Sequence, residues 1–314
     1  GKQNQKALRG GGSSQMNSIG TKPRRKKSDL TVAALFLMPS ALPMLIFVFI
    51  PMVGALLVST SDWNLIGKFN FIGLGNYQEL LTSPKTYLVF SNSFAYVLGY
   101  LPLVFFFGLL FALALNTRVR GRTFFRASFF LPVVTSWIAV SIVWKWLLNP
   151  SNGVVNSLLE AIGISGPGWW TDPNWAMPAI VIASAWKDIG FVTIILLAGL
   201  QNINEELIEA ALLDGAGWFR RLLSVVLPLL SPSLFFVFVI SMINGIQVFD
   251  QVFAMTGGGP GDSTRVVMQQ IYDLTFRYGR AGEAAALSWL LFAVILVVTV
   301  VQNFGQKRWV HYAD

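Results

Sequence analysis

The sequence predicts an all-α integral membrane protein with six transmembrane helices. Of its 314 residues, 54% are hydrophobic and only 12% are charged, whereas roughly a quarter of the residues of a typical soluble domain are charged. Six apolar stretches are long enough to cross about 30 Å of hydrocarbon as helices of about 20 residues. These stretches are continuously apolar and do not alternate, which favours helices over the strands of a closed barrel.

The six stretches are expected at residues 30–60, 88–115, 127–148, 176–200, 231–254 and 284–304. The first stretch follows a basic run, as a signal peptide does, but Leu30–Val58 is longer than a signal-peptide core and has no small-residue cleavage site. Prolines recur inside the stretches, and ordinary bundle geometry is favoured over a gating hinge as their role. These prolines are Pro39, Pro43, Pro51, Pro102, Pro132 and Pro178.

The chain divides into three expected parts. Residues 1–28 are polar and basic and should form a disordered tail, within which Met16 is a candidate natural start. Residues 29–305 should form the six-helix domain, and residues 306–314 a short C-terminal tail.

Basic residues in the connections predict the orientation. Most of them fall in the tails and in the second and fourth connections, so the positive-inside rule places those segments, and both termini, in the cytoplasm. The net charge of +8 does not indicate nucleic-acid binding, because the basic residues form short clusters between apolar runs and not a basic face.

Several kinds of catalytic site are excluded by composition. The chain has no cysteine and one histidine, His311, so a disulfide framework, a thiolate metal site and a multi-histidine site are impossible within it. No GxxxxGK[ST] phosphate-binding loop is present, so ATP must be bound elsewhere. The carboxylates are scattered, and we expect a chain that is not an enzyme and holds no cofactor.

The connection Asn202–Leu227 differs from the others in length and pattern. Residues 205–213 have apolar residues at helical spacing and carboxylates in the first turn, where the helix dipole favours them. Gly215 and Gly217 should end this helix, and a second helix should follow over residues 218–226. The pattern predicts either a docking element for a partner or an interfacial connector without one.

The spacing of Glu209, Ala210, Ala211 and Gly215 from Val225–Pro228 resembles the EAA loop of ABC importer permeases, although the family usually has isoleucine at Val225. The resemblance implies that this loop inserts into a groove of a separate ATPase, which binds ATP and Mg. Glu209 would pair with a basic residue there. The implied coupling residues are Glu209, Ala210, Ala211, Asp214, Gly215 and Gly217.

Three further tracts are similar to MalF-type permeases of oligosaccharide importers: FIGLGNYQELL at 71–81, LAGLQNI at 197–203 and VFDQVFAMTGGGPGDS at 248–263. The glycines of the last tract should allow a tight turn. The resemblance implies a multi-pass protein of the bacterial cytoplasmic membrane. Its implied partners are a second MalG-like permease, two ATPase subunits, an extracytoplasmic solute-binding protein, membrane lipid and a sugar.

Charged residues inside spans usually face a cavity or a partner, and Lys187 and Asp188 are such residues. In the family resemblance, the fourth and fifth helices carry the solute site. Asn244, Gln247 and Asp250 are three residues apart and are expected to form one stripe facing Lys187 or Asp188, unless these groups only bond helices together. The candidate pathway residues are Ser184, Trp186, Lys187, Asp188, Phe191, Asn244, Gln247, Phe249 and Asp250.

The expected function is therefore the pathway subunit of an ATP-driven, binding-protein-dependent importer of sugars, with oligosaccharides as the expected cargo. Lys187 leaves an acidic oligosaccharide such as a uronate, or glycerol phosphate, as an alternative cargo. An ion-coupled carrier is a second alternative, but it leaves the helix–turn–helix connection unexplained.

Overall fold

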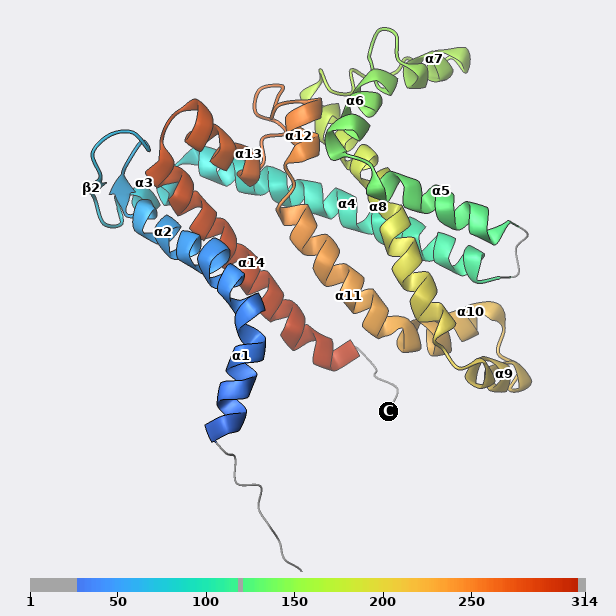
Figure 1. Cartoon of the computed structure of the whole chain (residues 1–314). Coiled ribbons are helices and arrows are strands. Elements are labelled where there is room, and N and C mark those ends of the chain that lie inside the picture. Colours follow the sequence, from blue (N-terminus) through green and yellow to red (C-terminus); the bar gives the residue numbers. More distant parts are fainter. Residues whose placement is uncertain (1–26, 118–120, 310–314) are drawn as a thin grey trace, which may run out of the picture. The chain divides into compact units, whose positions relative to one another are not determined.

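The computed structural model describes residues 27–117 and 121–309 (Figure 1). The expected N-terminal tail therefore lies almost entirely outside the described residues. The chain divides into two compact units, Gly1–Val53 and Gly54–Asp314, which are described separately.

The first unit contains α1 (Lys27–Met44) and a π-helical turn, η1 (Leu45–Phe49). Pro39 and Pro43 lie inside α1, where each removes a backbone donor. Every side chain from residue 34 to residue 53 is exposed, although most are apolar. This composition fits lipid, and the helical stretch Ala34–Ser59 is long and apolar enough to cross a membrane.

The second unit is almost wholly helical. After α2 (Ile50–Ser59), which begins in the first unit, two short strands pair antiparallel with Ser61 opposite Phe71. The elements of this unit are β1 (Ser61–Asp62), β2 (Asn70–Phe71), α3 (Gly75–Thr82), α4 (Pro84–Asn116), α5 (Arg122–Val134), α6 (Trp137–Leu147), α7 (Val154–Ala161), α8 (Pro173–Gln201), α9 (Glu205–Leu213), α10 (Trp218–Arg221), η2 (Leu222–Val226), α11 (Leu227–Ile246), α12 (Asp250–Met255), α13 (Val267–Tyr272), η3 (Asp273–Arg277) and α14 (Ala281–Trp309).

Within the described residues, five helical stretches are long and apolar enough to span a membrane, or six if one bent pair counts as a single span. That pair is α5 and α6, which correspond to the expected continuous helix at 127–148 but meet at 101°. With 13 and 11 residues, each is too short to cross about 30 Å alone. Pro132 lies in the last turn before the break, whereas Pro102 and Pro178 lie inside continuous helices.

The fifth expected helix has different boundaries from those the sequence indicated. Helix α10, turn η2 and α11 continue without interruption from Trp218 to Ile246, so Pro228 does not separate a surface helix from the span. The π-helical turn η2 ends at Val226, two residues before this proline, and such turns accommodate a missing backbone donor. The helix ends at Ile246, and the chain restarts as α12 at Asp250.

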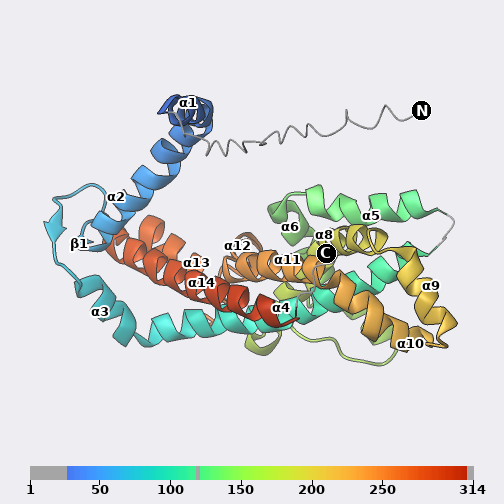
Figure 2. The same ribbon diagram turned by 90° about the horizontal axis from the view of Figure 1, so that it is seen from below.

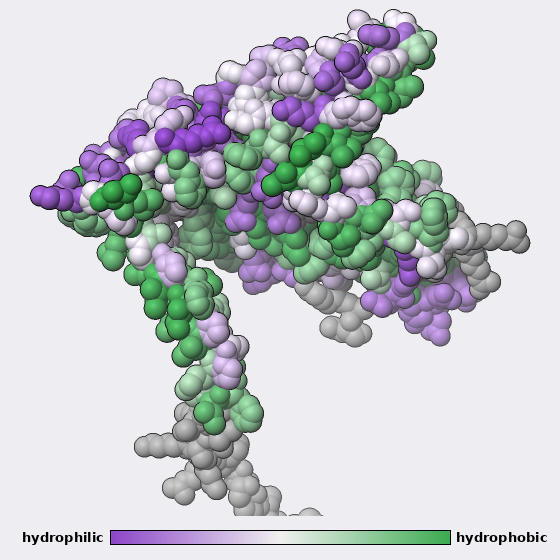
Figure 3. Space-filling model, turned by 45° about the horizontal axis from the view of Figure 1, so that its top comes forward, coloured by the Kyte–Doolittle hydropathy of each residue, from purple (hydrophilic) through white to green (hydrophobic). Residues whose placement is uncertain are grey.

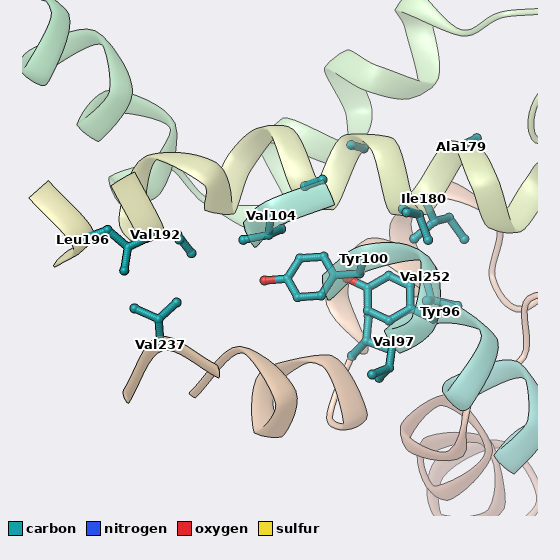
Figure 4. Packing of buried hydrophobic residues seen from close by; sticks show 14 of the residues in the cluster. Tyr96, Val97, Tyr100, Val104, Ala179, Ile180, Val192, Leu196, Val237 and Val252 are labelled. Carbon is teal, nitrogen blue, oxygen red and sulfur yellow. The ribbon is translucent and has the colours of Figure 1, made fainter. Parts of the chain in front are cut away.

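The main core lies where α8 packs between α5 on one side and α4 and α11 on the other (Figure 2). In Figure 4, Tyr96, Tyr100 and Val104 of α4 lie in the same apolar cluster as Ile180 and Val192 of α8. Glycines allow these helices to approach closely: a Cβ on Gly108 would lie 2.5 Å from Val192, and one on Gly199 would lie 2.4 Å from the Ser233 hydroxyl. Small residues at helix contacts are typical of membrane bundles.

The surface of the second unit has apolar sides and more polar ends (Figure 3). Large exposed apolar residues occur along its membrane-length helices, including Phe106 of α4 at 64% and Phe304 of α14 at 67%. In water, apolar surface of this extent indicates a protein or membrane partner. For helices of this length, the pattern fits a bilayer and neighbouring spans.

A charged cluster joins the loop before α13 to η3. The carboxylate of Asp273 is fully buried and forms ion pairs with Arg265 and, at 3.0 Å, with Arg277. Burial lowers the pKa of Arg265, but its bond to Asp262 and the nearby carboxylates outweigh this and raise it above the ordinary value. Gly257 and Gly258 have φ of 62° and 92°, which confirms the tight turn expected from the glycine run.

Candidate functional site

The predicted pathway residues lie on two neighbouring parts of the core. Ser184, Trp186, Lys187, Asp188 and Phe191 belong to α8. The other candidates lie at the end of α11, in the short link after it and at the start of α12.

Lys187 is bound to the break between α5 and α6. Its Nζ donates a hydrogen bond of 2.9 Å to the Val133 carbonyl oxygen and lies 4.7 Å from the ring centroid of Trp137. The side chain is almost completely buried. The ammonium therefore contacts the last turn of α5 and the first residue of α6.

Asp188, the next residue, is bound to a different helix. The Tyr100 hydroxyl of α4 donates a 2.7 Å hydrogen bond to Asp188 Oδ2. The Tyr100 ring stacks on Tyr96 with 5.4 Å between the ring centroids, and Gln251 Nε2 of α12 donates a 3.1 Å bond to the Tyr96 hydroxyl. These four residues form one polar cluster that connects α4, α8 and α12; we call it the tyrosine cluster.

The remaining candidates on α8 make simpler contacts. Ser184 is fully buried, and its hydroxyl donates to the Ile180 carbonyl oxygen at 2.8 Å. Trp186 is 48% exposed and packs edge-on against Trp144 of α6. Phe191 is half-buried against the main core.

The expected stripe on the fifth helix does not exist as one helical face. Asn244 lies in α11, but the helix ends at Ile246, and Gln247 follows as its C-cap. Asp250 begins α12 after Phe249, whose φ of −144° and ψ of −63° interrupt the helix. Because the helix is interrupted between Ile246 and Asp250, a helical period of 3.6 cannot be extended across this link. Asn244, Gln247 and Asp250 are all exposed.

Tyr96, Tyr100 and Gln251 were not among the residues predicted from the sequence. A usable signal was present, because Tyr96 and Tyr100 are four residues apart in an apolar helix and therefore share a face. A buried tyrosine hydroxyl needs a hydrogen-bond partner, and Asp188 is one of few carboxylates in the spans.

The predicted coupling residues lie at the other end of α8. Helix α9 covers residues 205–213 as predicted, and the Asn204 side chain caps it by accepting a 3.0 Å bond from the Glu206 amide. Gly215 has a φ of 77° and turns the chain into α10. Glu209 and Ala210 are exposed, and α9 contains no buried residue.

Helices α9 and α10 lie against the ends of α4 and α8 around an apolar groove of about 470 Å³. The groove is lined by residues of α4, α8, α9 and α10, among them Leu110, Leu200, Ile208 and Trp218. Trp218 and Phe219 are both more than half exposed and contact each other edge to face. The helix pair therefore presents a free outer surface while its inner side meets the bundle.

Among the described residues, no group of three or more histidine, cysteine, aspartate or glutamate side chains is arranged to hold a metal ion. The chain thus combines the membrane-length helices of an integral membrane protein with a buried polar cluster between them and an exposed helix–turn–helix at one end.

The chain belongs to the family of binding-protein-dependent transport system inner membrane components, whose model matches residues 104–310. It is 35% identical over 290 residues to the trehalose/maltose transport system permease protein MalF of Thermococcus litoralis, which covers 91% of this chain and 96% of that protein. It is 34% identical over 274 residues to the multiple sugar-binding transport system permease protein MsmF of Streptococcus mutans, covering 87% and 94%.

A solved structure has a similar fold. A chain from the crystal structure of a bacterial ABC transporter involved in the import of the acidic polysaccharide alginate is 27% identical, with a TM-score of 0.77, and the match covers 90% of this chain and 96% of that one. A second crystal structure shows the alginate transporter in complex with its pentasaccharide-bound periplasmic protein and matches with a TM-score of 0.76. This protein is thus a multi-pass inner-membrane permease subunit.

Proposed function

We propose that this chain is the pathway-forming subunit of an ATP-driven, binding-protein-dependent importer of sugars. The observation that carries the proposal is the exposed helix α9 and its glycine turn, which follow a membrane-length helix directly and have the pattern of an EAA loop. Relatives named as sugar permeases match almost the whole chain. In this proposal residues 29–305 form the permease domain and both termini are cytoplasmic.

In this function α9 is the element that couples transport to ATP hydrolysis. Its exposed face, with Glu209 and Ala210, would enter a groove on the ATPase, while Gly215 permits the turn. ATP and Mg belong to that ATPase. Asp214 caps the end of α9, and Gly217 precedes the first residue of α10, so both set the angle between the two helices.

The proposed partners are a second, MalG-like permease, two ATPase subunits and an extracytoplasmic solute-binding protein. The alginate transporter in complex with a binding protein supports such an assembly. Exposed apolar side chains along the spans of the second unit would face the second permease or lipid.

The tyrosine cluster and the neighbouring link between α11 and α12 form the proposed solute pathway. Hydroxyl, carboxylate and amide groups from three helices meet there, and exposed Asn244 and Gln247 lie beside the link. Phe249 stacks with Phe253 at 5.4 Å between ring centroids. Aromatic rings with nearby polar groups are suited to the apolar faces and hydroxyls of a sugar.

A neutral sugar is favoured over an acidic one. The buried cation of α8, Lys187, already bonds the Val133 carbonyl oxygen and lies over Trp137, so it is not a free anion site. The cluster beside it contains the carboxylate of Asp188, which would repel a uronate. Glycerol phosphate would be disfavoured for the same reason.

The test is ATP hydrolysis by the complete complex in lipid nanodiscs, with the binding protein loaded with neutral or uronic oligosaccharides. Wild-type complex should hydrolyse ATP faster with one loaded form, and Glu209→Ala should lower that stimulation at least tenfold, because a charge-assisted contact with the ATPase is lost. Glu160→Ala is a matched control, since Glu160 is also an exposed carboxylate on a short helix, α7.

Stimulation by uronic and not by neutral sugars would replace the neutral cargo with the acidic one. Hydrolysis that responds to no sugar would refute sugar import, and solute uptake without the ATPase would favour an ion-coupled carrier. Equal stimulation of wild-type and Glu209→Ala complexes would refute the coupling role of Glu209.

A further inference from the structure

The break between α5 and α6 leaves a backbone carbonyl without its helical partner. In an uninterrupted helix, the Val133 oxygen would accept from the amide of Trp137, four residues later. Here α5 ends at Val134 and α6 starts at Trp137 after a bend of 101°. Thr135 satisfies the neighbouring Pro132 oxygen with its amide at 3.2 Å and its hydroxyl at 2.6 Å.

Lys187 supplies the missing partner of Val133. Its Nζ donates to the Val133 oxygen at 2.9 Å and lies over the ring of Trp137, so one ammonium contacts both helices that meet at the break. A cation at a helix C-terminus is stabilised by the helix dipole, and a tryptophan face adds a cation–π contact.

These contacts, together with the charge of the neighbouring Asp188 carboxylate, compensate for burying the ammonium. Lys187 is only 4% exposed, and no carboxylate of the described residues lies within ion-pair distance of its Nζ. An ammonium removed from water is costly unless it is paired or hydrogen-bonded. Its direct contacts to the break are therefore the hydrogen bond to Val133 and the approach to the Trp137 ring.

Helix α8 connects Lys187 to the coupling segment. The helix continues from Lys187 to Gln201, and α9 starts at Glu205. Close to Lys187, a Cβ on Gly190 would lie 1.9 Å from the Phe129 carbonyl oxygen, so the backbones of α5 and α8 are in contact. A displacement of α9 would be passed along α8 to the break.

We propose that Lys187 is a positioning residue that fixes the bend between α5 and α6 to α8, so that a movement of α9 changes the bend of this broken span. The inference rests on the proposed coupling role of α9 and adds the contact through which the pathway helices follow it.

The test measures the bend directly in the complete complex. The chain has no cysteine, so the exposed positions Phe124 and Trp146 can be changed to cysteine and spin-labelled for distance measurement. Their backbones would be about 33 Å apart in a straight helix and about 20 Å apart across the observed bend. Lys187→Met should shift molecules from the bent toward the straighter arrangement of α5 and α6. The ratio of straighter to bent molecules should rise about tenfold, since a hydrogen bond from a charged group is lost.

Lys145→Met is the matched control, because Lys145 lies on α6 with its Nζ 5.0 Å from the Trp170 ring centroid but does not contact the break. It should leave the distances between the two labels unchanged.

A second readout is the number of sugar molecules transported per ATP hydrolysed, which should fall in Lys187→Met while hydrolysis persists. A purely structural role would lower both rates together.

Unchanged distances in Lys187→Met, or altered distances with unchanged sugar per ATP, would overturn the inference. If that variant does not assemble, Trp137→Leu removes the ring and keeps the hydrogen bond; it should broaden the distances, and an unaltered distribution would equally overturn the inference. Absence of sugar-dependent hydrolysis in the wild type would instead count against the proposed function, while the label distances still decide whether Lys187 holds the bend.

Discussion

Gly190→Ala is predicted to separate α5 from α8. The added Cβ would lie 1.9 Å from the Phe129 carbonyl oxygen and 2.8 Å from its carbonyl carbon, whereas a carbon–oxygen contact needs about 3.3 Å. One helix must therefore shift by about 1.4 Å. These are backbone atoms, so a side-chain rotation cannot relieve the contact.

The shift has two energetic consequences. Overpacking of this kind costs about 1–3 kcal/mol. The same shift stretches the bond from Lys187 to the Val133 oxygen, now 2.9 Å, beyond hydrogen-bond distance, and such a bond from a charged group contributes about 1.5–3 kcal/mol. Alanine returns up to about 1 kcal/mol of helix propensity, so we expect a net loss of about 2–5 kcal/mol.

The assay is thermal unfolding of purified protein in detergent, followed by the fluorescence of the 11 tryptophans. A loss of this size should lower Tm by roughly 5–15 °C, and the inactivation half-life should be compared as well, because unfolding of this protein in detergent is expected to be irreversible. Gly305→Ala is the matched control, since it gains the same helix propensity in α14 and a Cβ there meets nothing within 4 Å. Equal Tm values for the two variants would refute the close contact of α5 and α8.

Two further changes test the polar contacts. Tyr100→Phe should cost about 1.5–3 kcal/mol by removing the donor to Asp188; the measurement is Tm together with sugar-stimulated ATP hydrolysis, and a stability equal to wild type would contradict the cluster. Asp273→Asn should cost about 3–5 kcal/mol, because it leaves two arginines without their fully buried partner. Asp250→Asn, at an exposed carboxylate, should leave Tm nearly unchanged, and a similar Tm for the two asparagine variants would show that the ion pairs contribute little.

The transmembrane composition and helix α9 were predictable because their signals are local. Apolar runs of membrane length need no tertiary information, and α9 was placed at residues 205–213 from its apolar spacing, its first-turn carboxylates and the glycines that follow. Pro132 marked the position near which the third stretch breaks, but Pro102 and Pro178 are accommodated in unbroken helices. Proline alone therefore did not distinguish a bend from a continuous span.

The site was predicted less completely, because its contacts join helices far apart in the chain. Lys187 and Asp188 were singled out as costly charges, but their partners, the Val133 carbonyl oxygen and the Tyr100 hydroxyl, lie 54 and 88 residues away. The predicted stripe of Asn244, Gln247 and Asp250 assumed a continuous helix, and the link after Ile246 removes it.

That this protein is a helical membrane protein follows from its sequence alone, since hydropathy and residue spacing act over at most a few turns of helix. The neighbours that satisfy the buried charges, and the positions where the helices break, depend on how helices from distant parts of the chain pack together. A carbonyl released at a bend and an ammonium buried on another helix become partners only when packing brings them within about 3 Å, and no local pattern encodes that encounter.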